Sequence, residues 1–452
     1  MKRFLLIAVA LLISLSITAQ ERFVEHRVKW FETLASISEK YGVAPETILR
    51  YNNMEEGDVK ARVLLRIPLT PLPEQAEEQQ AAAEEVPEAQ SQEEEEIPNT
   101  IFDADNPLKV SLILPFGAGS ENPSVNYFDF YSGALMALRS ATAAGLPVEL
   151  SVYDLKSTSF ETLILNPEFA SSKLIIGPPH ASELEPFAAF ALEHQIALVS
   201  PMDPGAEHLV SGNPYLFQVP TSSSVRLSNL LGRLNPSEEE EVLVFYDSSM
   251  KEEALVGKIT SSLDSMGIAY RPIGYGLLNG RDLSENLQKE LDPEKEYKVI
   301  VASEDDAFAP DIVRNMRVLK LFAIPVELYC SNRVRNFESI DSDSFYELST
   351  HVCASYFIDY SSENVGKFVY QYRALFNAEP TPYSFQGFDI ISYFATTMCT
   401  AGSNFIFTAD RYPMDMLQCS IRFARDDEKS GWRNIATRNI SYNEDLTISV
   451  DR

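Results

Sequence analysis

Residues 175–185 read IIGPPHASELE and decide how the larger part of the chain is interpreted. A short apolar run, residues 173–176, leads into Gly177, two prolines and His180, and a helical pattern follows. Such a corner can bind an anion, because free backbone N–H groups and the positive end of the helix dipole point out of it. It can equally be a structural corner without a ligand, so the neighbouring residues decide between the two interpretations.

The residues of the corner itself favour the structural interpretation. Ser182 and Glu185 have the spacing of a capping box, in which the serine accepts from the third N–H of the helix and the glutamate bonds back to the serine. Glu183 adds a negative charge to the first helical turn, and Pro178 and Pro179 remove two backbone donors from the loop.

The loop after the next strand brings a further carboxylate. Residues 200–204 read SPMDP, so Asp203 is expected near the same corner. Two like charges about 4 Å apart near a protein surface repel by a few kcal/mol. The sequence therefore predicts a poor site for an amino-acid carboxylate, while a cationic, neutral or sugar-like ligand stays open.

Apolar runs of strand length alternate with helical patterns from Leu108 to the end of the chain. Strand-like runs occupy residues 110–116, 148–153, 174–176, 196–199, 215–219, 241–246 and 297–301, and helical spacing occupies residues 130–141, 224–234 and 252–266. The alternation predicts parallel α/β sheets, and the nearly continuous apolar strands predict burial on both faces. About 340 residues are too many for one sheet layer, so two lobes are expected, the second at roughly 220–350.

The order of these elements and several local motifs resemble the type I periplasmic binding proteins of the leucine-binding-protein-like class. The matching residues are Ile176-Gly177-Pro178 with Ser182, Val199-Ser200-Pro201, residues 383–390 with Phe388-Asp389, and residues 431–434. The resemblance implies that residues 108–452 form two lobes with a cleft between them. In the amino-acid-binding members, loops after the third and fourth strands hold the ligand carboxylate and the second lobe supplies an acid for the ammonium. On this basis the candidate ligand-binding residues are Gly177, His180, Ser182, Ser200, Asp203, Ser303 and Asp305.

Residues 1–19 have the pattern of a secretory signal peptide. Lys2 and Arg3 precede an apolar run from Phe4 to Leu15, and small residues lead to Ala19. The run is short for a bilayer span, and no cysteine follows it. We therefore expect cleavage after Ala19, and an exported protein of the periplasm or cell envelope without a lipid anchor or a later membrane span.

Residues 26–68 predict a small strand–helix–helix–strand module. Alternation starts at His26, one helical pattern ends before Gly42, a second starts at Pro45, and residues 63–68 read as a closing strand.

This module resembles a LysM domain at Val28-Lys29, Thr33-Leu34, Ile37, residues 40–43, Tyr51-Asn52 and residues 65–68. The resemblance implies binding to glycans that contain N-acetylglucosamine, which in a bacterial envelope means peptidoglycan. Its two sugar-reading loops would contain the candidate glycan-binding residues Trp30, Phe31, Glu32, Thr33, Asn52, Asn53 and Met54.

Residues 69–106 predict a disordered acidic linker. They contain ten Glu and two Asp but no Lys or Arg, and such a segment cannot bury enough apolar surface to fold. The whole chain has a formal charge of −29. This charge argues against nucleic acid and against an anionic membrane surface as partners.

Catalytic and metal-site motifs are missing from the sequence. There is no GxSxG, GxGxxG or phosphate-loop motif, and no metal-binding spacing among His26, His180, His194, His208 and His351. We therefore expect a protein that is not an enzyme and needs no cofactor or metal. Export permits disulfides, so the sequence leaves open whether disulfides or free thiols are formed by Cys330, Cys353, Cys399 and Cys419.

These features predict an exported envelope protein that binds peptidoglycan through the LysM-like module and presents the two-lobed domain for protein interaction or regulation. The combination of module, acidic linker and fold resembles exported proteins of Bacteroidetes-type bacteria. The alternative is a solute-binding or sensing protein whose cleft closes on a small amino-acid-like, amine or sugar-like ligand. A cell-wall hydrolase fits less well, because the catalytic motifs are missing.

Overall fold

The computed structural model describes residues 23–28, 34–41, 43–52, 54, 63–68 and 99–451. Contacts divide the chain into two compact units, Met1–Ile97 and Pro98–Arg452. The expected signal peptide and most of the expected linker lie outside the described residues.

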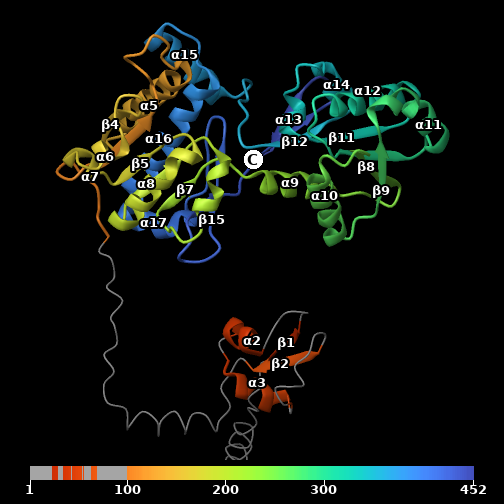
Figure 1. Ribbon diagram of the computed structural model, residues 1–452, viewed down its shortest axis with the longest axis horizontal. Coiled ribbons are helices and arrows are strands. Elements are labelled where there is room, and N and C mark those ends of the chain that lie inside the picture. The colour runs from red at the N-terminus through yellow and green to blue at the C-terminus, as the bar shows by residue number, and fades with distance from the viewer. Residues whose placement is uncertain are drawn as a thin grey trace, which may run out of the picture. The chain divides into compact units, whose positions relative to one another are not determined.

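The N-terminal unit has the predicted strand–helix–helix–strand order (Figure 1). Its elements are β1 (Phe23–Arg27), α2 (Leu34–Tyr41), α3 (Pro45–Asn52) and β2 (Leu64–Pro68). The two strands pair antiparallel, with His26 opposite Leu65. The apolar positions of both helices meet those of the strands in a small core of Val28, Leu34, Ile37, Ile48, Leu65 and Ile67. The first strand begins at Phe23, ahead of the predicted start at His26.

The larger unit contains two seven-stranded sheets that form separate lobes (Figure 1). The first sheet has the order β15-β16-β7-β6-β5-β3-β4. Its strands are β3 (Leu108–Leu114), β4 (Val148–Asp154), β5 (Leu174–Ile176), β6 (Ala197–Ser200), β7 (Leu216–Gln218), β15 (Phe423–Ala424) and β16 (Trp432–Asn434). All neighbours are parallel except the pair β15 and β16. The predicted parallel α/β architecture is confirmed in this lobe.

The second sheet has the order β18-β17-β12-β11-β10-β8-β9. Its strands are β8 (Glu240–Asp247), β9 (Tyr270–Tyr275), β10 (Glu296–Val301), β11 (Val326–Ser331), β12 (His351–Ala354), β17 (Arg438–Tyr442) and β18 (Ile448–Asp451). The last two strands come from the end of the chain and pair antiparallel. The second lobe therefore extends beyond the expected range of roughly 220–350.

Helices cover both faces of each sheet, as the apolar strands require. In the first lobe, α5 (Val125–Ala143) and α16 (Pro382–Ala401) pack on one face, and α8 (Ala181–His194) packs on the other. In the second lobe, α12 (Phe308–Leu321) covers one face, and α9 (Ser223–Leu231) and α10 (Glu253–Met266) cover the other. Further helices complete the layers: α6 (Phe160–Leu163), α7 (Pro167–Ala170), α11 (Leu283–Glu290), α13 (Asn332–Arg335), α14 (Ser342–Glu347), α15 (Glu363–Phe376) and α17 (Phe405–Thr408).

Two glycines let α5 and α16 touch backbone to backbone. A Cβ added to Gly133 would lie 1.8 Å from the carbonyl oxygen of Ser384, and one added to Gly387 would lie 2.0 Å from that of Phe130. A larger residue at either glycine position would push the two helices apart. The close contact fixes the two helices side by side, with the N-termini of both near the cleft described below.

The last residues of the expected linker are packed on the first lobe. The backbone N–H of Thr100 donates to Ser403 Oγ at 2.8 Å, and Phe102 is buried in the core of that lobe. The predicted linker boundary at residue 106 therefore differs from the structure, because Phe102 supplies an apolar anchor within the acidic composition.

Within residues 99–451, three segments cross between the lobes, at residues 219–222, 355–362 and 435–437. They are tied together by hydrogen bonds. Thr221 Oγ1 donates to Ala436 O at 2.6 Å, and Ser355 Oγ donates to Thr221 O at 3.3 Å. These bonds form the connection between the lobes, beside the cleft.

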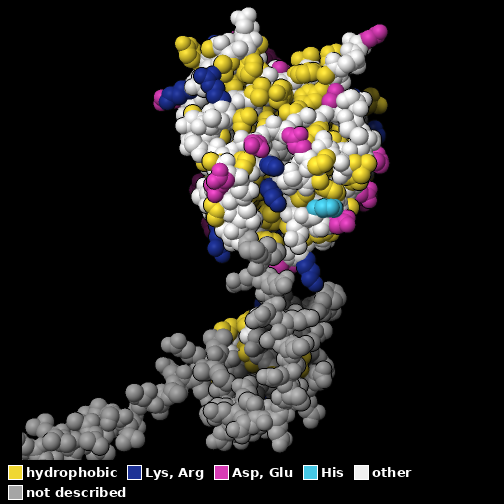
Figure 2. Space-filling view, turned by 90° about the vertical axis from the view of Figure 1, so that its left-hand side faces the viewer, with side chains coloured by type: hydrophobic (Ala, Val, Ile, Leu, Met, Phe, Trp, Pro, Cys, Tyr) yellow, Lys and Arg dark blue, Asp and Glu magenta, His cyan; other side chains and the backbone are white. Residues whose placement is uncertain are grey.

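The surface of the larger unit carries mixed charges. Figure 2 shows acidic, basic and apolar side chains interspersed on the face turned to the viewer. Much of the excess negative charge belongs to the segment 69–106 with its twelve acidic residues. Among the described residues, no helix has the length and apolar character needed to cross a bilayer.

Candidate functional site

The loop after β5 is fixed by a glycine. Gly177 has a φ of +93°, and an added Cβ would lie 2.2 Å from the carbonyl oxygen of Ile113. Its backbone N–H donates to Val199 O at 2.9 Å. Only glycine combines this backbone conformation with such a close approach, so Gly177 shapes the corner rather than offering a free donor.

The start of α8 differs from the sequence prediction. The helix begins at Ala181 with His180 as N-cap residue, and the predicted Ser182 capping box is wrong, because Ser182 already lies exposed in the first turn. Asp203 Oδ2 accepts from the backbone N–H of Ala181 at 2.9 Å, and its Oδ1 accepts from Gly205 N–H at 2.7 Å. The carboxylate of the neighbouring loop thus occupies the helix N-terminus.

The other two candidates of the first lobe have partners within the chain. His180 Nε2 lies 3.0 Å from the Tyr127 hydroxyl, and its ring is exposed. Ser200 is buried, and its hydroxyl donates to Asp203 O at 3.5 Å. His180 and Asp203 face the cleft, and Ser200 supports the loop that carries Asp203.

The candidates of the second lobe also serve local structure. The buried Ser303 hydroxyl donates to Glu252, and Glu304 N–H donates to Glu252 Oε1 at 2.9 Å. Asp305 Oδ1 accepts from the N–H groups of Ala307 at 3.0 Å and Phe308 at 2.9 Å, at the start of α12. Glu252, which the sequence reasoning missed, and Glu304 are the acids of this lobe that line the larger cavity described next.

Two adjoining cavities open between the lobes. The larger has a volume of about 890 Å³ and the smaller about 660 Å³, and Met202, Pro204 and Tyr356 line both. Among the seven predicted cleft residues, His180 and Asp203 line the smaller cavity, whereas Gly177, Ser182, Ser200, Ser303 and Asp305 line neither.

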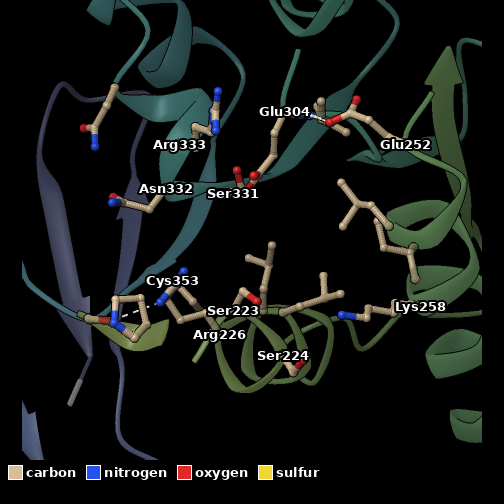
Figure 3. A pocket seen from close by; sticks show the side chains of 18 of the residues that line it. Ser223, Ser224, Arg226, Glu252, Lys258, Glu304, Ser331, Asn332, Arg333 and Cys353 are labelled. Carbon is tan, nitrogen blue, oxygen red and sulfur yellow. Dashed lines mark hydrogen bonds between the residues drawn. The ribbon is translucent and has the colours of Figure 1, made fainter. Parts of the chain in front are cut away.

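The larger cavity lies mostly on the second lobe and carries charges of both signs. Figure 3 shows Ser331, Asn332 and Arg333 across the cavity from Ser223 and Ser224, with Glu252 and Lys258 on a further side. Apolar side chains complete the lining, among them Leu227, Leu230, Leu255, Ile259, Ile300 and Phe337. A ligand with separated polar groups on an apolar body fits such a lining.

Arg226 links this cavity to the segments that join the lobes. Its Nη1 donates to Thr221 O, and also to Ser355 Oγ at 3.3 Å. Burial lowers the pKa of Arg226, while Glu304 and Tyr356 act in the opposite direction. The hydrogen bonds of the guanidinium therefore serve mainly to hold together the segments that connect the lobes.

The smaller cavity lies on the first lobe, where three helix N-termini meet. Ser124, His180 and Pro382, at the starts of α5, α8 and α16, line it together. The remaining lining residues are Asn126, Tyr127, Pro179, Met202, Asp203, Pro204, Tyr356, Tyr383, Gln386 and Gln418, and none of the lining residues is Lys or Arg.

Two of the seven candidate glycan-binding residues are described in the N-terminal unit. Asn52 Nδ2 donates to Ile48 O and Arg66 O, both at 2.8 Å, and Asn52 Oδ1 accepts from Arg66 N–H at 2.7 Å. Met54 packs against the small core. Asn52 thus joins α3 to β2, and Trp30, Phe31, Glu32, Thr33 and Asn53 lie outside the described residues.

The four cysteines are free thiols in the structure. Cys330 and Cys353 lie on the adjacent strands β11 and β12, but their side chains belong to the cores on opposite faces of the sheet. Burial raises the pKa of the Cys353 and Cys399 thiols to about 11. Among the described residues, no group of three His, Cys, Asp or Glu side chains could hold a metal ion.

No protein-family model matches the chain, and no curated protein sequence does. Solved structures match the fold across 76% of the chain. A branched-chain amino acid ABC transporter protein from Rhodospirillum rubrum is similar at 15% identity over 100% of its length, with a TM-score of 0.55. An ABC-type branched-chain amino acid transporter protein from Rhodopseudomonas palustris is similar at 14% identity over 95% of its length, with a TM-score of 0.51. The larger unit therefore has the two-lobed fold of type I periplasmic binding proteins.

Proposed function

We propose that this chain is an exported, non-enzymatic binding protein of the cell envelope, whose two-lobed domain takes a small polar ligand in the cleft. The observation that carries the proposal is the pair of adjoining cavities, about 890 and 660 Å³, lined by polar groups from both lobes. Both volumes are in the range of small-molecule sites, which combine an apolar lining with a few convergent polar groups.

The ligand is not expected to be bound through an amino-acid carboxylate at the α8 corner. The N–H of Ala181 is already used by Asp203, whose negative charge would repel a second carboxylate. This distinguishes the chain from the amino-acid-binding members that its sequence resembles.

The N-terminal unit is proposed to attach the protein to peptidoglycan. Its strand–helix–helix–strand order and antiparallel strand pair support the LysM resemblance. Attachment there would keep the two-lobed domain near the cell wall on the acidic segment 69–98, which contains ten Glu and no Lys or Arg.

A protein partner is the second candidate for the two-lobed domain, and the sequence alone favours it. The observation in favour of a protein partner is that apolar side chains are exposed in segments that follow the carboxyl ends of strands in both sheets. Val125, at the start of α5, is 70% exposed, and Leu278, which follows β9, is 97% exposed. A protein partner that contacts either edge would bury the exposed side chain there.

A thermal-shift screen of the full exported chain tests ligand binding. Amino acids, amines, sugars and muropeptides are added, and the melting temperature is followed against concentration. A ligand at about a hundred times its Kd stabilises the folded state by about 2.7 kcal/mol and raises the melting temperature by several degrees. No shift with any class would reject the cleft as a small-molecule site and leave the protein partner.

Sedimentation with purified peptidoglycan tests the N-terminal unit separately. The full chain should sediment with the polymer, and the Trp30→Ala variant should stay largely in solution. Equal sedimentation of both chains would contradict a role for the predicted glycan-reading loop.

A further inference from the structure

The smaller cavity contains a buried amide without a partner. Gln418 is 2% exposed and lines the cavity, yet its side-chain amide makes no hydrogen bond to any residue in 99–451. Its backbone is held firmly, since its N–H donates to Asp389 at 2.8 Å and its carbonyl accepts from Phe357 at 2.8 Å. The amide atoms are open to the cavity rather than sealed from solvent, so their donors and acceptor are available to a bound molecule.

Tyrosines form an aromatic wall around this amide. Tyr127, Tyr356 and Tyr383 all line the cavity, and their rings pack on the apolar core of the first lobe. The Tyr383 hydroxyl makes no hydrogen bond within the described residues of the larger unit, whereas Tyr127 bonds His180 and Tyr356 bonds Pro201 O. Such rings present an apolar face with a polar tip.

The charges around the cavity offset one another. Three helix N-termini each carry about half a positive elementary charge, and they disfavour a cation. Asp203 opposes them with a full negative charge, Glu183 in the first turn of α8 adds another, and no Lys or Arg lines the cavity to hold an anion. These opposing charges favour neither sign of ligand charge, and an uncharged polar ligand fits.

The geometry points to an uncharged carbohydrate in the smaller cavity, with a sugar ring packed on Tyr127 and Tyr383 and its hydroxyls bonded to the Gln418 amide. This inference rests on the proposed ligand-binding function of the cleft and names the ligand class. A sugar ring has a C–H face for the tyrosines and hydroxyls that both donate and accept, as the amide requires. A charged substituent would extend into the larger cavity, where Lys258, Arg333 and Glu252 lie.

Isothermal titration calorimetry of the full chain tests this inference. The neutral probes are N-acetylglucosamine, its β-1,4-linked dimer, galactose and ribose, and leucine, putrescine and citrate are the charged probes. Two variants address the cavity: Gln418→Met keeps the side-chain volume but removes hydrogen bonding, and Tyr383→Ala removes a ring. Tyr370→Ala is the matched control, because Tyr370 is 77% exposed on α15 and lines neither cleft cavity.

We expect a neutral sugar to bind saturably and both cavity variants to weaken it by about tenfold or more, a difference typical of a lost buried contact. Tyr370→Ala should bind as the unaltered chain does. Gln418→Met should melt near the temperature of the unaltered chain, because the amide makes no hydrogen bond to any residue in 99–451 that the change would remove. Loss of binding together with retained stability separates recognition from folding.

Three outcomes would overturn the inference in distinguishable ways. Binding of a charged probe alone, lost in Tyr383→Ala, would keep the cleft as a ligand site and reject the carbohydrate class. Sugar binding that is equal in the unaltered chain and both cavity variants would place it elsewhere, such as the N-terminal unit. If no probe binds in a way that depends on Gln418 or Tyr383, the inference is rejected. If, in addition, no ligand class shifts the melting temperature, the proposed ligand-binding function of the cleft is rejected as well.

Discussion

The carboxylate of Asp203 accepts a hydrogen bond from the backbone N–H of Ala181 at 2.9 Å, and so completes the start of α8 from a loop 22 residues further along the chain. Its second oxygen accepts from Gly205 N–H at 2.7 Å. One side chain therefore caps α8 and also the 3₁₀ helix at Pro204–Leu209. The place where a ligand carboxylate could bind is filled by the protein itself.

The Asp203→Ala variant tests this double role. It leaves both N–H groups without their acceptor, so we expect the free energy of unfolding to fall by about 1–3 kcal/mol. Asp203→Asn keeps one acceptor oxygen and should lose less. Urea unfolding measures both, and Asp306→Ala is the control, because that exposed side chain makes no hydrogen bond within residues 99–451. If Asp203→Ala were as stable as the control, the cap would contribute nothing.

The contact between α5 and α16 predicts opposite effects for two glycine-to-alanine changes. In Gly387→Ala, the new methyl group would lie 2.0 Å from Phe130 O, so the helices must separate, and we expect a loss of about 3 kcal/mol or more. In Gly366→Ala on α15, the methyl group meets no atom within 4 Å, and better helix propensity should add up to about 1 kcal/mol. Thermal melts show whether each variant is less or more stable than the unaltered chain. Equal changes in melting temperature for the two variants would contradict the close contact between α5 and α16.

Local patterns in the sequence predict the elements well, because burial imposes them directly. The apolar run at 110–116 corresponds to β3, and the helical spacing at 252–266 corresponds to α10 at Glu253–Met266. The pairing of β17 with β12 is not visible in such patterns. Two strands about ninety residues apart in the chain pair only in the complete fold. Local patterns therefore place the end of the second lobe too early in the sequence.

The site was harder to predict than the fold, since its residues come from distant segments. Tyr127, Tyr383 and Gln418 meet in one cavity although almost three hundred residues separate the first from the last. The Ser182 motif failed for the same reason, because Asp203 reached the first N–H of α8 from another loop. The Tyr127 and Gln418 positions have no local signal, whereas Tyr383 lies in the segment that carried the family resemblance.

The four thiols should all be free in the folded protein. Ellman's reagent is expected to titrate four thiols per chain after denaturation without reductant, and to react slowly with the native chain. Burial raises the pKa of Cys330 to about 12 and that of Cys399 to about 11, so little reactive thiolate forms near neutral pH. Cys399, which is the only one of the four not fully buried, should react first. Fewer than four thiols in the denatured, unreduced chain would show a disulfide.

Asp389 should give the protein a specific dependence of stability on pH. Burial raises its pKa from 3.8 to about 6, although the N–H groups of Leu417, Gln418 and Cys419 donate to the carboxylate and act in the opposite direction. The folded chain then keeps a proton that the unfolded chain releases between about pH 4 and pH 6. The contribution of this group to the free energy of unfolding is therefore full below about pH 4 and is lost as the pH rises through 6.

The Asp389→Asn variant isolates this contribution, because every other titrating group remains in both chains. The two pKa values of Asp389 differ by about 2, which corresponds to at most about 3 kcal/mol. We expect the stability of the unaltered chain to fall relative to that of the variant by up to this amount between about pH 4 and pH 6. The variant should still be the less stable chain near neutral pH, because its amide offers one acceptor oxygen where three N–H groups donate. Urea unfolding at intervals across this range measures the difference, and parallel profiles for the two chains would show that Asp389 does not take up a proton on folding.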